Sequence, residues 1–177
     1  MDVLVTERLE LRRPVIGDLA DVYAVHADPE TSRYNPSGPD ADEQASRLRL
    51  QGWIADWRER GIGYWTVRAG GVVLGFGGLR FHEVEGDVVL NLYYRFRPAA
   101  WGRGYAREMA AAALAAGRER FPDLPIVAVV RDINIPSRKV AEGIGMRFDR
   151  TIPYVGVDSH VFVLDPGVRP APNGANR

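Results

Sequence analysis

Cysteine is absent from the 177 residues of the chain. The protein therefore has no disulfide framework, no thiolate nucleophile and no cysteine-ligated metal centre. Histidine is the other usual zinc ligand, and the three histidines, His26, His82 and His160, are scattered along the chain. Because a zinc site needs clustered ligands, we expect no bound metal.

An excess of charge of either sign is also missing. Lysine and arginine total 23, as do aspartate and glutamate, so the formal net charge is zero. No overall field would attract nucleic acid or an anionic membrane surface. No apolar run is long enough to span a bilayer, and residues 1–8 carry acid where a secretory signal would carry a basic region. We expect no nucleic-acid or membrane partner and a cytoplasmic location.

What the sequence does contain is enough apolar material for one soluble domain. Apolar residues make up 46% of the chain and charged residues 26%, which is typical of a globular protein with a full core. The last residues are rich in proline, glycine and asparagine. We therefore expect one domain over residues 1–165 and a disordered C-terminal tail over residues 166–177.

Hydrophobic periodicity and turn residues predict alternating strands and helices. The first half predicts a strand at residues 9–13, a helix capped by Asp18 that stops near Asp28, a loop over 31–40, and a helix opened by Asp40 and Glu43 and closed by Gly61. The second half predicts a hairpin over 64–76, a central strand over 88–96, a helix over 105–121, a strand over 126–130, a helix from Pro136 to Gly145, and strands at 146–150 and 159–164. These elements indicate an α/β chain with about four helices. Gly75, Gly77 and Gly78 mark either a bulge or a close backbone approach in the hairpin.

Residues 97–106 are the most informative segment, because they join the central strand to a long helix through a Gly-x-Gly turn. The first N–H groups of a helix lack internal partners, so this arrangement can bind an anion such as a diphosphate. Arg103 and Arg107 can add charge-assisted hydrogen bonds. The turn is not a P-loop and lacks the third glycine of a dinucleotide fingerprint. Taken alone, the segment is a weak signal, and a tight turn without a ligand is the alternative interpretation.

Three motifs together resemble the GNAT superfamily of acetyltransferases. Trp101, Gly104 and Ala106 take the first, fourth and sixth positions of its acyl-CoA pyrophosphate loop, Gln/Arg-x-x-Gly-x-Gly/Ala. The opening Thr6-Glu7-Arg8-Leu9-x-Leu11-Arg12 resembles the branch of ribosomal-protein N-terminal acetyltransferases. Downstream, Asn134-Ile135-Pro136-Ser137-Arg138-Lys139-Val140 and Gly145-Met146 resemble a third family pattern. The matches appear in family order and span roughly residues 6 to 148.

The resemblance implies a GNAT fold, a mostly antiparallel sheet splayed at its centre, with acetyl-CoA as the acyl donor. Pantetheine would pair with the backbone of the central strand, and the N–H of Tyr94 would polarise the thioester carbonyl. Asn134 would bond the pantetheine amide region. The implied cofactor contacts are Tyr94, Arg95, Phe96, Trp101, Gly102, Arg103, Gly104, Tyr105, Ala106, Arg107, Asn134, Ser137 and Arg138.

The implied reaction is acetyl transfer to a primary amine, either a peptide N-terminus or a small molecule. Many relatives carry a glutamate base at the position of Asn91, so His82 becomes the candidate base, with Glu83 and Glu85 as candidates that are equally a solvated turn. The tyrosine acid of many relatives is Ala141 here. Either Ser137 or solvent would then protonate the departing thiolate.

Tyr34, Trp53 and Asn91 are the candidate acceptor-binding residues, and Trp57 and Tyr154 are further candidates. For the two tryptophans, core packing of an amphipathic helix is the alternative interpretation. A CoA-binding sensor without turnover is the alternative function, while a nucleotide-binding module is disfavoured because Walker residues are lacking. A homodimer formed through the C-terminal strands is possible.

Overall fold

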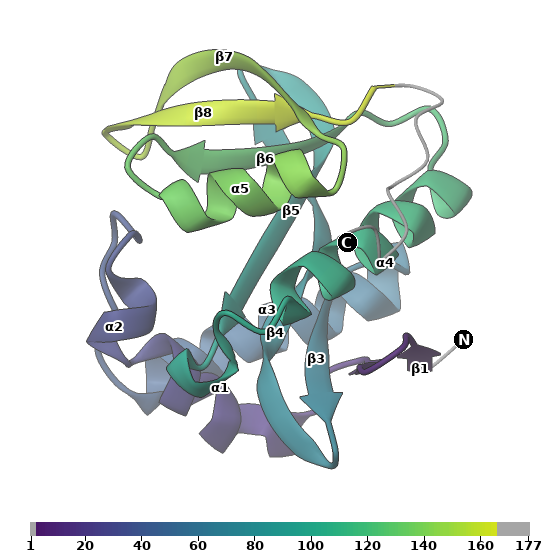
Figure 1. Ribbon diagram of the computed structural model, residues 1–177. Helices are drawn as coiled ribbons and strands as arrows, with labels where there is room; N and C mark the ends of the chain where they lie inside the picture. Colours follow the sequence, from purple (N-terminus) through teal and green to yellow (C-terminus); the bar gives the residue numbers. More distant parts are fainter. Residues whose placement is uncertain (1–2, 166–177) are drawn as a thin grey trace.

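The computed structural model describes residues 3–165 and contains one eight-stranded mixed sheet of order β1-β2-β3-β4-β5-β6-β8-β7 (Figure 1). The strands are β1 (Val3–Val5), β2 (Glu10–Arg12), β3 (Tyr64–Ala69), β4 (Val72–Val84), β5 (Asp87–Phe96), β6 (Ile126–Arg131), β7 (Arg147–Tyr154) and β8 (Val157–Val163). All neighbours are antiparallel except β5 and β6, which are parallel. The expected fold class, a mostly antiparallel mixed sheet, is confirmed.

Helices flank the sheet on both faces. They are η1 (Ile16–Asp18), α1 (Leu19–His26), α2 (Pro29–Ser32), α3 (Glu43–Arg60), η2 (Pro98–Ala100), α4 (Tyr105–Arg120) and α5 (Ile135–Gly143). The short α2 begins inside a region where a stop and then a loop were expected. Asp28 and Pro29 end α1 but also start α2, because the Asp28 side chain accepts a hydrogen bond from the Glu30 N–H and Pro29 takes the first turn.

The predicted cap Asp40 is wrong, while Asp18 is the N-cap residue of α1 but makes no side-chain capping hydrogen bond to it. Asp42, not Asp40, caps α3 by accepting a 2.8 Å hydrogen bond from the Ala45 N–H. The Asp40 carboxylate pairs with Arg49 and accepts from Ser46. Asp18 pairs with Arg12 across η1 and accepts from Thr66. A capping pattern considers only the first turn of one helix, so it cannot reveal that Arg12 or Arg49 competes for the same carboxylate.

The glycines of β4 permit close approach to β5, and they do not mark a bulge between these strands. The register of β4 with β5 is continuous. The pairing of β3 with β4 skips Leu74, because Val67 pairs with Gly75 and Arg68 with Val73, so the bulge of the hairpin lies in β4 beside Gly75. A Cβ placed on Gly75 would lie 2.3 Å from the Arg95 carbonyl oxygen, and one on Gly77 would lie 2.8 Å from that of Tyr93. The backbones can come this close only because side chains are missing there.

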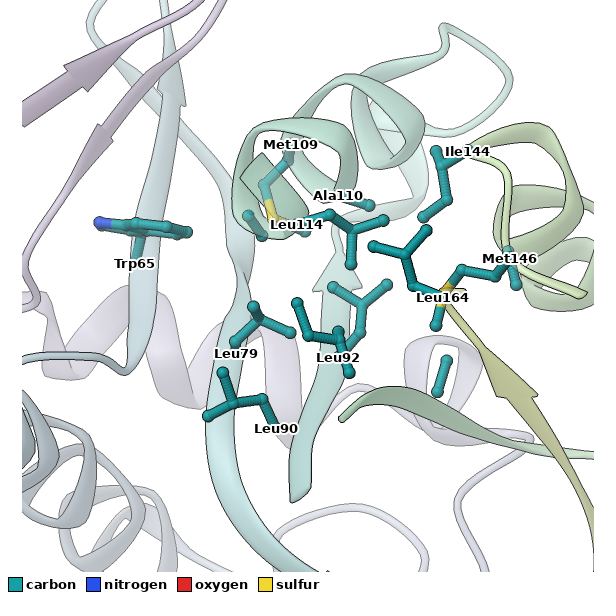
Figure 2. Close-up of a cluster of buried hydrophobic side chains, with 14 of the residues drawn as sticks. Trp65, Leu79, Leu90, Leu92, Met109, Ala110, Leu114, Ile144, Met146 and Leu164 are labelled. Carbon is teal, nitrogen blue, oxygen red and sulfur yellow. The ribbon is translucent and has the colours of Figure 1, made fainter. Parts of the chain in front are cut away.

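The largest hydrophobic cluster lies between the sheet and helices α4 and α5. Met109, Ala110 and Leu114 of α4 point toward Leu79, Leu90 and Leu92, and Ile144 and Met146 close the far side (Figure 2). Small residues let α4 approach the sheet, as the alanine-rich sequence predicts. A second cluster, on the opposite face, joins α1 and α3 to the sheet. The central strands are therefore held from both sides.

The homodimer and the C-terminal tail expected from the sequence are not tested by the fold. Strand β7 is at the edge of the sheet, where a second copy would pair, and the dimer stays a prediction. The tail predicted over residues 166–177 lies outside the described residues. Within residues 3–165, no helix combines the length and apolarity needed to cross a membrane.

Replacing Gly77 with alanine should destabilise the fold by about 1 to 3 kcal/mol, since the new Cβ would press against β5 backbone that cannot move aside easily. Gly52 on α3 is the matched control, because a Cβ there meets nothing within 4 Å. Gly52→Ala should raise the free energy of unfolding by up to about 1 kcal/mol. Urea unfolding of both variants measures this. Equal stability of Gly77→Ala and the parent protein would contradict the close approach.

Candidate active site

The two parallel strands at the centre of the sheet separate after two residues of pairing. The only register pairs are Leu90 with Ile126 and Asn91 with Val127. Beyond these pairs the two strands diverge. Helix α2 lies near the end of β5, and α5 lies beside β6 (Figure 1). Asn91 sits at the point of separation, where its Oδ1 accepts a 3.1 Å hydrogen bond from the Val129 N–H. This side chain takes the place of the next backbone partner of Val129.

The freed edge of β5 presents backbone groups to the opening. The Leu90 N–H donates toward β6, to the Pro125 carbonyl, and the Arg97 N–H donates toward β4, to the Leu74 carbonyl. Because N–H directions alternate along a strand, the N–H groups of Tyr94 and Phe96 face the opening. Unpaired backbone donors of this kind need a partner. Here they form a sheet edge inside the protein.

Arg95 and Trp101, two of the expected cofactor contacts, already have contacts within the protein. The Arg95 carbonyl oxygen lies against Gly75 of β4, so its backbone faces away from the opening. The Trp101 indole donates a 2.9 Å hydrogen bond to the Phe96 carbonyl, while 37% of its surface stays exposed. Trp101 thereby fixes the loop that leads from β5 to α4.

That loop ends in a bare helix N-terminus. Gly102 and Gly104 adopt left-handed conformations with φ of 71° and 78°, which glycine tolerates best. Gly104 is the N-cap residue of α4, and no side chain caps the helix. The first N–H groups of α4, from Tyr105 onward, are therefore free to bind an anion. Arg103 is exposed beside them, and Arg107 is half-buried on the side of Gly143 in α5.

A buried carboxylate fastens this loop to the N-terminal segment. Glu108, in the first turn of α4, accepts hydrogen bonds from the Thr6 hydroxyl (2.5 Å), the Arg8 N–H (2.8 Å) and the Arg8 Nε (2.7 Å). Arg8 also donates to the Arg103 carbonyl at 2.8 Å and lies over the Tyr105 ring at 4.9 Å. The opening motif of the sequence therefore supports the pyrophosphate-type loop.

Glu108 was not among the predicted site residues. An acid in the first turn of a helix is visible in the sequence, but its partner Arg8 is 100 residues away. Burial alone would raise the pKa of Glu108, yet the hydrogen bonds from Thr6 and Arg8 outweigh it and hold this pKa below its usual value. The carboxylate is thus ionised and fully enclosed, with 0% of its side chain exposed.

Helix α5 supplies the opposite side of the opening. The Asn134 Oδ1 caps the helix by accepting from the Ser137 N–H at 3.2 Å, which leaves its Nδ2 as a donor. Arg138 donates a hydrogen bond to the Asp132 carbonyl.

Burial raises the pKa of Tyr94 to about 12, and a hydrogen bond with Ser137 of α5 acts in the opposite direction. Two predicted catalytic residues are thus brought together. Ala141 is 2% exposed and lies in the core.

The candidate base lies on the other face of the sheet. His82 Nε2 lies 2.8 Å from the Tyr154 hydroxyl. Burial, with the nearby Arg80 charge, lowers the His82 pKa, so the neutral ring predominates near pH 7. Glu83 in β4 and Glu85 on the turn that follows are exposed, and Glu85 pairs with Arg150. Within residues 3–165 no three acidic or histidine side chains gather closely enough to hold a metal ion.

The aromatic candidates for the acceptor site separate into core and surface. Trp53 is 1% exposed and packs 5.4 Å from His26 and 5.3 Å from Phe76, so it lies in the core, as the packing interpretation predicts. Trp57 donates to the Tyr64 carbonyl. Tyr34 is half-buried on the segment after α2. Of these three, Tyr34 is the one best placed to contact a ligand.

A second buried pair escaped sequence reasoning. His26 Nε2 lies 2.9 Å from the Tyr93 hydroxyl, and Tyr93 stacks on Tyr64 with ring centres 4.8 Å apart. Burial, then the charges of Arg95 and Arg49, lower the pKa of His26 to about 3. His26 is therefore a neutral residue that packs against Tyr93 of β5.

Glu108→Gln should lower the free energy of unfolding at neutral pH by roughly 1 to 3 kcal/mol, because Arg8 loses its charged partner. A carboxylate with a depressed pKa stabilises the fold above its unfolded value of 4.5 and loses that effect as pH falls through the folded pKa. The difference between variant and parent should accordingly shrink below about pH 4.5. Urea unfolding across pH tests this. Glu43→Gln on exposed α3 should show no such trend.

Comparison with known proteins agrees with this geometry. The model of the acetyltransferase (GNAT) domain family matches residues 8–147. The protein YkkB of Bacillus subtilis (strain 168) is 29% identical over 157 residues, covering 84% of this chain and 87% of its own length. A putative GnaT-family acetyltransferase from Bordetella pertussis superposes with a TM-score of 0.80 at 23% identity, covering 93% of this chain and 100% of its own.

A third similar structure was determined with a ligand. RimL, the ribosomal L7/L12 α-N-protein acetyltransferase in complex with coenzyme A, superposes with a TM-score of 0.69 at 16% identity, covering 93% of this chain and 99% of its own. At this identity the likeness concerns the fold. Since the family model spans residues 8–147 of 177, the chain belongs to the GNAT acetyltransferases, the family of acetyl-CoA-dependent acyltransferases.

Proposed function

We propose that the protein binds acetyl-CoA in the opening between β5 and β6 and transfers its acetyl group to a primary amine in a ternary complex. The observation that carries this proposal is the unpaired edge of β5, with the N–H groups of Tyr94 and Phe96 facing the opening, next to the uncapped N-terminus of α4. An acceptor amine of a peptide N-terminus is favoured by the resemblance of residues 6–12 to the ribosomal-protein branch. A small-molecule amine is the alternative acceptor.

The residues present fit acetyl-CoA along its length. The N–H groups between Gly102 and Ala106 would hold the diphosphate, with Arg103 and Arg107 adding charge. Tyr94 and Phe96 would pair with the pantetheine amides as a neighbouring strand does. The free Nδ2 of Asn134 would donate to the same arm, while Ser137 and Arg138 flank it on α5.

Catalysis would combine positioning with a single backbone oxyanion donor. The amine nitrogen attacks the thioester carbonyl carbon, a C–N bond forms, and the C–S bond breaks. The Tyr94 N–H stabilises the negative charge on the carbonyl oxygen. Holding the amine and the thioester in reacting geometry lowers the activation free energy, because the entropy of bringing them together is lost on binding. Acetyl-CoA brings the activated acyl group, and the chain supplies the geometry.

Two protons must also move. His82 is the proposed acceptor of the amine proton, because its neutral ring predominates near pH 7. The register places it opposite Val89, five residues before Tyr94, so the proton reaches it through water or through Tyr154. On the other face, Ser137 beside the Tyr94 hydroxyl is the proposed donor to the departing thiolate, with solvent as the alternative.

A CoA-binding protein without turnover is the second candidate. Asn91 favours it, because an amide cannot accept the amine proton and its Oδ1 is already bonded to Val129. The buried Ala141 likewise offers no hydroxyl to the thiolate. Asn91 would then serve only to keep the strands apart.

Calorimetric titration with acetyl-CoA, followed by thiol release against peptides, amino acids, polyamines and amino sugars, separates these functions. We expect binding in the micromolar range, about 8 kcal/mol of binding free energy, and turnover on at least one amine. Binding without turnover on the whole panel would favour the sensor. The absence of binding would contradict both candidates.

Asn134→Asp should weaken acetyl-CoA binding about fivefold, the loss of one hydrogen bond of ~1 kcal/mol, without loss of stability. Aspartate keeps the oxygen that caps α5 but removes the Nδ2 donor. Calorimetry gives the affinity, and thermal unfolding shows that the cap is retained. An unchanged affinity in a stable Asn134→Asp protein would confine Asn134 to its capping role.

A further inference from the structure

Arg33 and Arg95, near the end of β5 and the end of α2, have no carboxylate partner within residues 3–165. Their neighbours do have partners: Arg49 pairs with Asp40, Arg80 with Asp56, and Arg97 with Asp21. Arg95 is half-buried, so its charge is partly removed from water. A partly desolvated cation without a counter-charge is unfavourable unless a ligand supplies the anion.

Arg95 is held in a fixed direction. Its Nη1 donates a 3.1 Å hydrogen bond to the Ser32 hydroxyl at the end of α2, and its guanidinium lies 5.8 Å from the Tyr93 ring centre. Ser32 is 2% exposed and itself donates to the His26 carbonyl. Arg95 thus points to the α1–α2 face of β5. Tyr94, the preceding residue, points to the opposite face, toward Ser137.

Arg33 is exposed and bridges two loops. It follows Ser32 in sequence, and its guanidinium lies 5.1 Å from the ring centres of both Tyr34 and Trp101. Trp101 is tied to the Phe96 carbonyl, so the bridge connects the end of α2 to the end of β5. Two cations and two aromatic rings consequently border the open end of β5.

We propose that the acetyl acceptor carries a carboxylate close to its amine and that Arg95 and Arg33 bind this carboxylate. The inference rests on the proposed transferase function and names its substrate class. Guanidinium groups bind carboxylates through two parallel hydrogen bonds, which orient as well as attract. We assign the anion bound by Arg95 to the acceptor, and not to the phosphates of acetyl-CoA. The reason is that Arg95 faces away from the surface that α4 covers.

Matched acceptor pairs test this class by thiol release. Serine is compared with serinamide, and a serine-initiated tetrapeptide with two glutamates is compared with the same peptide carrying two lysines. We expect kcat/KM to be at least about tenfold higher for the carboxylate-bearing member of one pair, the first pair indicating a free amino acid and the second an acidic peptide. Arg95→Met and Arg33→Met should bring that ratio close to one through a higher acceptor KM, while Arg47→Met on exposed α3 should preserve it.

A second measurement does not depend on turnover. Calorimetry measures how the acetylated product of the preferred carboxylate-bearing acceptor binds to the CoA-saturated protein. If neither acceptor is preferred, both acidic products are titrated. We expect binding that Arg95→Met weakens at least about fivefold. A ratio unchanged in both variants, or a loss confined to acetyl-CoA affinity, would overturn the inference. The absence of acetyl-CoA binding by the parent protein would instead overturn the proposed function.

Discussion

The separation of β5 from β6 is the constraint on which the rest of this molecule depends. Two parallel residue pairs hold the strands together, and beyond them the Asn91 side chain takes the hydrogen bond of Val129 that a backbone carbonyl would otherwise accept. Sheets normally satisfy every backbone group along a central strand. This one leaves donors of β5 facing the opening without a strand partner, and we propose that acetyl-CoA pairs with them.

The packing around the opening keeps that unpaired edge rigid. Helix α4 presses small residues onto Leu79, Leu90 and Leu92, while the cluster around Trp53 supports the opposite face. Glu108 adds a polar anchor, because it joins the N-terminal segment to the first turn of α4 by three hydrogen bonds. The loop between β5 and α4 is therefore held in place by the protein itself, so a ligand bound there would lose less entropy on binding.

The two faces of β5 divide the chemistry between them. Tyr94 and Ser137 meet on the side of α4 and α5, where the acyl donor is proposed to lie. Arg95 and Ser32 meet on the side of α1 and α2, where the acceptor is proposed to approach. Because side chains alternate along a strand, neighbouring residues of one strand can serve two substrates. In our proposals, the donor side of β5 binds acetyl-CoA, and Arg95 and Arg33 bind the acceptor on the other side.

The sequence by itself determined the elements and the loop. An apolar and aromatic run located β5, an alanine-rich composition located α4, Pro136 and Gly145 bounded α5, and the glycines at 102 and 104 indicated a turn, because these are local properties of the chain. Only the tertiary structure decided what pairs with what. Asp18 accepts a hydrogen bond from Thr66, 48 residues away, Trp53 is in the core, and Arg8 reaches Glu108 across 100 residues. Such contacts depend on the folded arrangement of remote segments, which no local pattern encodes.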